Sequence, residues 1–111
     1  PKDLTISEDK PFKTLVIDQM ANSILQDKKG CYRCGSCRFL ESHHIFGASN
    51  RKKSEQYGFK VWLCHNCHNE PPGGVHFNKD FNMYLKRTCQ KKFEETHTRA
   101  EFMALIGKNY L

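Results

Sequence analysis

Four cysteines form two C-x-x-C pairs, and this spacing is typical of zinc ligands. Cys31 and Cys34 make the first pair, and Cys64 and Cys67 make the second. Two such pairs can present four thiolates as a tetrahedron, the geometry that Zn²⁺ accepts. A chain of 111 residues has a small hydrophobic core, so we expect this zinc ion to stabilise the fold rather than to take part in catalysis.

A second register of the first pair stays open, because Cys34-x-x-Cys37 has the same spacing. We favour Cys31 and Cys34, since they leave a longer, strand-compatible run before the histidine pair. Cys89 falls inside a predicted helix and is interpreted as a packing residue. The apolar run at residues 15–17 is too short for a signal-peptide core, so a metal site is expected rather than disulfides. A thioredoxin-like redox pair would need a βαβ context, which the chain lacks.

Two short strands are expected to position these cysteines. Residues 39–40 and 60–63 are apolar enough for strands, and the basic stretch 47–56 between them is expected to be a loop. Residues 71–74, Pro-Pro-Gly-Gly, have strong turn chemistry. The first C-x-x-C pair therefore precedes one strand, and the second pair follows the other directly.

Three helices are predicted from the spacing of apolar residues, over residues 18–28, 75–95 and 98–107. The last one opens with the capping-box pattern of Thr98 and Glu101. The expected apolar face of the middle helix contains Phe77, Phe81, Tyr84, Leu85 and Thr88. With the two strands, these helices predict an α+β fold. The expected boundaries are residues 1–17 for an arm or linker, 18–111 for one domain and 31–95 for its core.

A histidine pair and an asparagine lie between the two cysteine pairs, and more histidines follow. His43-His44 comes after the first strand, Asn50 lies in the loop, and His68 and His76 follow the second C-x-x-C. Together with the cysteines, this order resembles the HNH endonuclease family. The run from His43 to Asn50 and the run Gly-Val-His-Phe-Asn-Lys around His76 look most like small phage and prophage HNH proteins. That group includes recombination-enhancement nucleases that act with a RecA-type recombinase.

The resemblance implies a zinc-stapled ββα-metal core and a role for each of three residues. The first histidine of the pair binds the catalytic metal in this family, and the second is the general base; these roles fall on His43 and His44. Imidazole can accept a proton near neutral pH. Asn50 would orient the base. The metal could be Mg²⁺, Mn²⁺, Ni²⁺ or Zn²⁺, and the implied products carry a 5′-phosphate and a 3′-hydroxyl.

The histidine that completes the catalytic metal site has two candidates. In the plain pattern it follows the second C-x-x-C directly, which is His68. The turn at residues 71–74 delays the next helix, however, and places His76 in its expected first turn. We favour His76, with His68 as a second ligand or a neighbour of the zinc site. Asp80, four residues after His76, is a further candidate ligand.

Positive charge is concentrated in the middle of the chain. Lys plus Arg number 18 against 12 Asp plus Glu, which gives a net charge of +6. Residues 28–93 alone hold thirteen basic and four acidic groups, or +9. A basic centre suits a polyanion such as DNA. The predicted phosphate contacts are Arg51, Lys52, Lys53, Lys86 and Arg87, which would bind without regard to sequence.

These features together predict a metal-dependent DNA endonuclease with little sequence specificity, which nicks because each chain has one active site. The resemblance implies a role in phage recombination or DNA processing. It also implies a RecA-type filament as partner and the cytoplasm of a bacterial or phage-infected cell as location. With a mean hydropathy of −0.73 and no run of about 18 apolar residues, no membrane association is expected. The alternatives are a non-catalytic zinc-dependent DNA-binding module and a recombinase-interacting protein.

Overall fold

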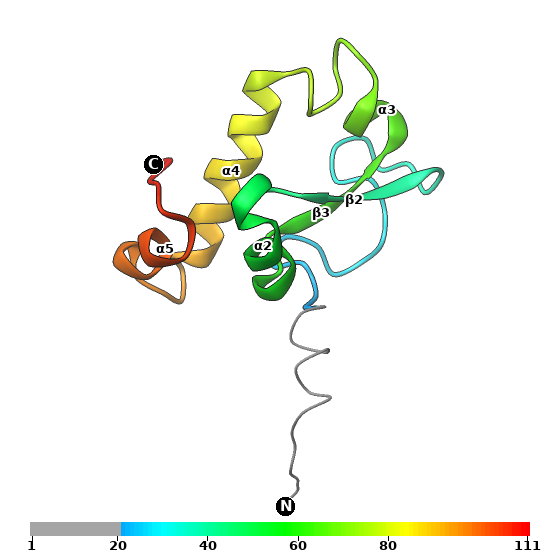
Figure 1. Ribbon diagram of the computed structural model, residues 1–111. Coiled ribbons are helices and arrows are strands. Elements are labelled where there is room, and N and C mark those ends of the chain that lie inside the picture. Colours follow the sequence, from blue (N-terminus) through cyan, green and yellow to red (C-terminus); the bar gives the residue numbers. More distant parts are fainter. Residues whose placement is uncertain (1–20) are drawn as a thin grey trace, which may run out of the picture.

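Two antiparallel strands, β2 (Leu40–His44) and β3 (Lys60–Cys64), form the sheet at the centre of the fold (Figure 1). The computed structural model describes residues 21–111. In the strand register His43 lies opposite Val61, and His44 lies opposite Lys60. The first strand is longer than the predicted 39–40 and includes the histidine pair, because its partner strand extends far enough to bond with it.

The connection between the strands is helical, so the expectation of a loop over residues 47–56 is wrong. It contains the 3-10 helix η1 (Ala48–Asn50) and the α-helix α2 (Arg51–Tyr57). Ser54 is buried, and its hydroxyl accepts a hydrogen bond from the Phe46 N–H and donates one to the Phe46 carbonyl. The helix ends at Gly58, whose φ of 77° is in the left-handed region that glycine adopts without strain.

Helix α3 (His65–Asn69) follows β3 directly, and α2 and α3 therefore lie at opposite ends of the sheet (Figure 1). The long helix α4 (Lys79–Phe93) begins four residues later than predicted. Asn78 caps it by accepting a hydrogen bond from the Phe81 N–H at 3.0 Å. His76 therefore lies in the turn before α4 and not in its first helical turn.

The last helix, α5 (Arg99–Ile106), confirms the predicted capping box. The Thr98 hydroxyl accepts a hydrogen bond from the Glu101 N–H, and the Glu101 carboxylate accepts one from the Thr98 N–H. Gly107 ends the helix with a φ of 89°. The prediction for residues 98–107 is therefore correct at both ends.

One hydrophobic core joins the sheet to the two C-terminal helices. Its α4 stripe has a spacing of four residues and consists of Phe81, Leu85, Cys89 and Phe93. Val61 and Leu63 of β3 belong to the same core, and Cys89 is a packing residue as expected. Phe77 and Tyr84, predicted on the buried face, are 56% and 57% exposed, because Phe77 precedes the helix and Tyr84 lies beside the stripe. The fold class is α+β, as predicted.

The predicted helix over residues 18–28 is absent from its described part, residues 21–28. Local hydrogen bonds form instead, because the Ser23 hydroxyl accepts from the Leu25 and Gln26 N–H groups. The segment packs beside the end of α2, where the Ile24 N–H donates to the Gly58 carbonyl. The predicted arm at residues 1–17 lies outside the described residues. Among residues 21–111, no helix is both long and apolar enough to cross a membrane.

Candidate functional site

Four cysteines meet where the turn at residues 31–37 reaches the corner between β3 and α3. The sulfur atoms of Cys31, Cys34, Cys64 and Cys67 all lie within 4.8 Å of one another. Cys34 Sγ and Cys64 Sγ are 3.7 Å apart. The exposed Cys37 is not part of this group, so the geometry supports the favoured register.

The thiols of this cluster differ in acidity in the way expected of crowded metal ligands. Burial by itself raises the pKa of the Cys31 thiol, but hydrogen bonds from the backbone of Cys64, Cys34 and Arg33 lower it to about 6. Burial and the neighbouring sulfur atoms raise the pKa of the Cys67 thiol to about 12. A divalent cation would replace the protons that these sulfur atoms share. The four cysteines could therefore bind a structural metal such as zinc.

Three histidines form a second cluster, on the face of the sheet that also carries Val61, the strand partner of His43. His43 comes from β2, His68 from α3, and His76 from the turn before α4, and one ring nitrogen of each lies within 4.8 Å of the others. His68 Nε2 and His76 Nε2 are 3.0 Å apart. The structure thus brings together both candidates for the remaining histidine ligand, whereas Asp80 is exposed on α4 and lies outside the cluster.

The donor set of this cluster fits a divalent cation. His43 Nε2 is the one buried side-chain nitrogen or oxygen without a hydrogen-bond partner among the described residues. Burial, followed by the nearby imidazoles of His68 and His76, lowers the pKa of His43 to about 3, so its ring is neutral at physiological pH. A buried polar atom without a partner costs free energy. A cation bound to three neutral imidazoles would remove that cost.

Glu41 holds one member of the histidine cluster in place. Its carboxylate accepts hydrogen bonds from His68 Nδ1 at 2.7 Å and from His65 Nδ1 at 2.9 Å. These bonds lower the pKa of Glu41 to about 2. Because the carboxylate occupies Nδ1 of His68, Nε2 of that ring is left free to face the metal position. Sequence reasoning missed Glu41, although its place two residues before His43 puts it on the same face of the strand.

We expect Glu41→Gln to weaken metal binding by the histidine cluster about 10- to 100-fold, the usual effect of losing a carboxylate that orients a ligand. Competition with a metallochromic chelator for Ni²⁺ would measure this change. Glu70→Gln is the matched control, because the Glu70 carboxylate bonds to Nε2 of His65 and, among the described residues, to no histidine of the cluster. Equal Ni²⁺ affinities of the parent and Glu41→Gln would show that Glu41 does not orient His68.

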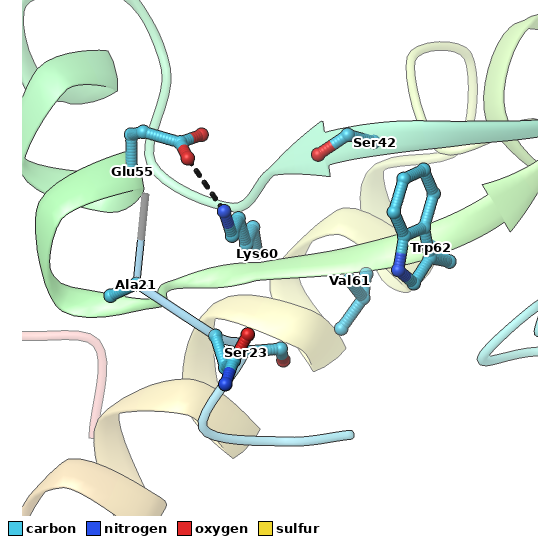
Figure 2. A pocket seen from close by; sticks show the side chains of 8 residues that line it. Ala21, Ser23, Ser42, Glu55, Lys60, Val61 and Trp62 are labelled. Atoms are coloured by element: carbon cyan, nitrogen blue, oxygen red, sulfur yellow. Dashed lines mark hydrogen bonds and ion pairs between the residues drawn. The ribbon is translucent and has the colours of Figure 1, made fainter. Parts of the chain in front are cut away.

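His44 points to the opposite face of the sheet from His43. Its Nε2 is 2.7 Å from Glu55 Oε1 in α2, and Glu55 Oε2 accepts a hydrogen bond from Lys60 Nζ at 2.6 Å. Figure 2 shows this Glu55–Lys60 contact beside a pocket on the same side of the sheet as Ser42. Glu55 was missed because α2 was expected to be a loop. An adjoining hollow is lined by His44, Ala48, Ser49, Arg51, Lys52 and Glu55.

Two residues with an expected role at the site bond instead to the end of α5. Asn50 Nδ2 donates to the Ile106 carbonyl at 3.0 Å, and Lys53 Nζ donates to the Leu105 carbonyl at 2.8 Å. Both carbonyls are among the last of the helix and have no partner within it. No hydrogen bond joins Asn50 to His44 among the described residues.

We expect Asn50→Ala to lower the free energy of unfolding by about 1 kcal/mol, the net value of a typical hydrogen bond. Urea unfolding of the zinc-loaded protein would measure it, with Gln56→Ala on the exposed side of α2 as the control. Unchanged unfolding together with lost DNA cleavage would contradict this assignment and favour the orienting role that the family resemblance implies.

The predicted DNA contacts fall in two places. Arg51 and Lys52 are exposed and line the hollow beside His44. Lys86 and Arg87 lie on α4, where Arg87 Nε donates to the Tyr110 carbonyl at 3.2 Å and Lys86 Nζ is 5.3 Å from the centre of the Tyr110 ring. Lys86 also acts electrostatically on His43. Basic side chains therefore lie near both histidines of the pair.

The chain matches no protein-family model, no curated protein and no solved structure. Its function must therefore be inferred from the two groups of metal ligands and from the side chains around His44.

Proposed function

We propose that the protein is a metal-dependent endonuclease of the HNH type that hydrolyses DNA phosphodiester bonds. The observation that carries this proposal is that His43, His68 and His76 bring one ring nitrogen each within 4.8 Å of the others, with His44 next to His43 in the chain. In chain order β2 and β3, with η1 and α2 between them, precede α3, and this order supports the proposal of a strand–strand–helix core. The four-cysteine cluster would hold a structural zinc ion at the corner where β3 becomes α3.

In the proposed reaction, His44 takes a proton from a water molecule. The water oxygen forms a bond to phosphorus while the bond from phosphorus to the 3′ oxygen breaks. The 3′ oxygen then takes a proton from solvent, which leaves a 5′-phosphate and a 3′-hydroxyl. A divalent cation held by His43, His68 and His76 would stabilise negative charge on the phosphate. Three imidazole ligands favour Ni²⁺ or Zn²⁺ over Mg²⁺ at such a site.

The charge of the chain supports DNA as the substrate. Arg51 and Lys52 line the hollow that contains His44, where they would bind phosphates next to the scissile bond. Contacts of this kind do not read bases, so we expect weak sequence preference and strong salt dependence. One histidine cluster in the described chain supports nicking of a single strand per encounter.

Nicking of supercoiled plasmid at low salt tests this proposal directly. The purified protein would be incubated with Mg²⁺, Mn²⁺, Ni²⁺, Zn²⁺ or EDTA, and open-circle DNA would be measured. We expect supercoiled plasmid to be converted to open-circle DNA with a transition metal ion and to stay supercoiled with EDTA. Absence of conversion with every metal would reject an autonomous nuclease.

A non-catalytic zinc-dependent DNA-binding module is the second candidate. The observation that favours it is the position of His44, which lies on the opposite face of the sheet from His43 and the histidine cluster. Such a module would bind DNA and both metals without cutting. Cutting only in the presence of a RecA-type filament would instead support a partner-dependent nuclease in phage recombination.

A further inference from the structure

The contact between His44 and Glu55 constrains the proton on the His44 ring. The distance from Nε2 to Glu55 Oε1 is 2.7 Å, and the two side chains are 14% and 30% exposed. Burial by itself would raise the pKa of Glu55, but hydrogen bonds from Lys60 and His44 lower it below its ordinary value. An ionised carboxylate only accepts hydrogen bonds, so His44 Nε2 must carry the hydrogen.

The backbone around this pair is fixed from both sides. Ser54, the residue before Glu55, is buried and bonds to both backbone groups of Phe46, two residues after His44. On the other side, Lys60 lies opposite His44 in the sheet and binds the second carboxylate oxygen at 2.6 Å. The Glu55 carboxylate is therefore held by α2 on one side and by Lys60 of β3 on the other, and this position does not depend on a bound substrate.

We propose that Glu55 is the positioning residue of His44, holding its imidazole with the hydrogen on Nε2 and the lone pair on Nδ1. The inference rests on the nuclease function proposed above and names the atom that takes the proton from water. In a neutral imidazole only the nitrogen without hydrogen can act as a base. Glu55 thus performs the orienting role that the family resemblance assigns to Asn50, whose amide is bonded to the end of α5.

A purely structural role for Glu55 predicts different behaviour. In that case its ion pair with Lys60 would only join α2 to β3, and its loss would affect folding whether or not His44 is present. A positioning role acts through His44 alone. The effects of Glu55 and His44 substitutions on the cleavage rate should then be strongly non-additive.

The first measurement is single-turnover nicking by the zinc-loaded full chain, with plasmid affinity measured in parallel. We expect Glu55→Ala to slow bond cleavage about 10- to 100-fold, the range seen when an orienting partner of a site histidine is lost. The plasmid Kd should change less than about threefold, and Glu55→Gln should recover part of the rate because its amide oxygen still accepts from Nε2. Lys60→Met separates the two roles, because it removes the ion pair that helps to hold the carboxylate but leaves Glu55 beside His44. It should therefore slow cleavage less than Glu55→Ala does.

The second measurement is the tautomer of His44, read from its ring ¹⁵N chemical shifts. We expect the Nε2–H form in the parent and in Lys60→Met, and a mixture of both forms in Glu55→Ala. This readout does not depend on cleavage. It therefore separates failure of the Glu55 assignment from failure of the nuclease function.

Three results would overturn the inference. One is an unchanged tautomer and cleavage rate in Glu55→Ala. Another is that Glu55→Ala slows cleavage by the same factor in the parent and in the His44→Ala protein, where the residual cleavage rate is measured. The third is an equal loss in Lys60→Met and Glu55→Ala, which would assign Glu55 to the structural ion pair. A parent that shows the Nε2–H tautomer but never nicks DNA would instead reject the proposed function, and with it the catalytic meaning of Glu55.

Discussion

Replacing His44 with alanine should slow metal-dependent nicking about 10²- to 10⁴-fold while the plasmid Kd changes by less than about threefold. A positioned general base typically contributes 10²- to 10⁴-fold to the rate, and alanine cannot accept the proton of the attacking water. The His44 side chain is only 14% exposed and lines the hollow with Arg51 and Lys52, so phosphate binding by those two cations should persist. Single-turnover nicking and filter binding on the same preparations would measure both quantities.

His97→Ala is the matched control for this experiment. His97 is an exposed histidine whose ring stacks on Phe93 with centres 4.2 Å apart, and it belongs to neither group of metal ligands. The His97→Ala protein should nick DNA at the same rate as the parent. A His44→Ala protein that nicks as fast as the parent would show that another group activates the water. If parent and variant both bind DNA and neither cuts it, the non-catalytic module becomes the better conclusion.

The cysteine cluster could be predicted from the sequence because the spacing is local. A C-x-x-C pair brings two sulfur atoms together within one turn, so only the approach of the two pairs depends on the fold. The histidine cluster could be predicted in part for the same reason, since His68 follows Cys67 directly. Whether the histidine cluster contains both His68 and His76 could not be predicted from the sequence, because it depends on where α4 begins. Asn78 sets that start by capping the helix.

The histidine partners of the site carboxylates could not be predicted, because each carboxylate bonds to a histidine that is well separated from it in the sequence. Glu41 bonds to His68, 27 residues away, and Glu55 bonds to His44 across the connection between the strands. Helix α2 itself was missed because its sequence, RKKSEQY, has no apolar periodicity. Its stability depends on tertiary contacts, chiefly those of the buried Ser54 with Phe46.

Removal of the metal from the four cysteines should unfold the domain. Structural zinc contributes an apparent free energy of about 10–16 kcal/mol in small zinc domains, which is comparable to the roughly 5–15 kcal/mol of stability that a native domain has. Cys31 and Cys64 are buried and belong to the hydrophobic core, so their uncompensated sulfur atoms would be left inside it. We expect Cys64→Ser to lose one equivalent of zinc and the cooperative unfolding transition of the parent. Metal content by atomic spectroscopy and near-ultraviolet circular dichroism of the aromatic core would measure these losses.

The control is Cys37→Ser, which tests the zinc register at the same time. Cys37 is exposed and lies outside the cluster, whereas Cys31 is 4% exposed and within it. Because only the sulfur atoms inside the cluster can reach a common metal, Cys37→Ser should keep the zinc content and unfolding midpoint of the parent, and Cys31→Ser should lose both. The reverse pattern would show that Cys34 and Cys37 bind the metal.

His43→Ala is the corresponding variant of the histidine cluster. It should release metal from the histidine cluster alone and leave a folded, zinc-containing domain that no longer nicks DNA.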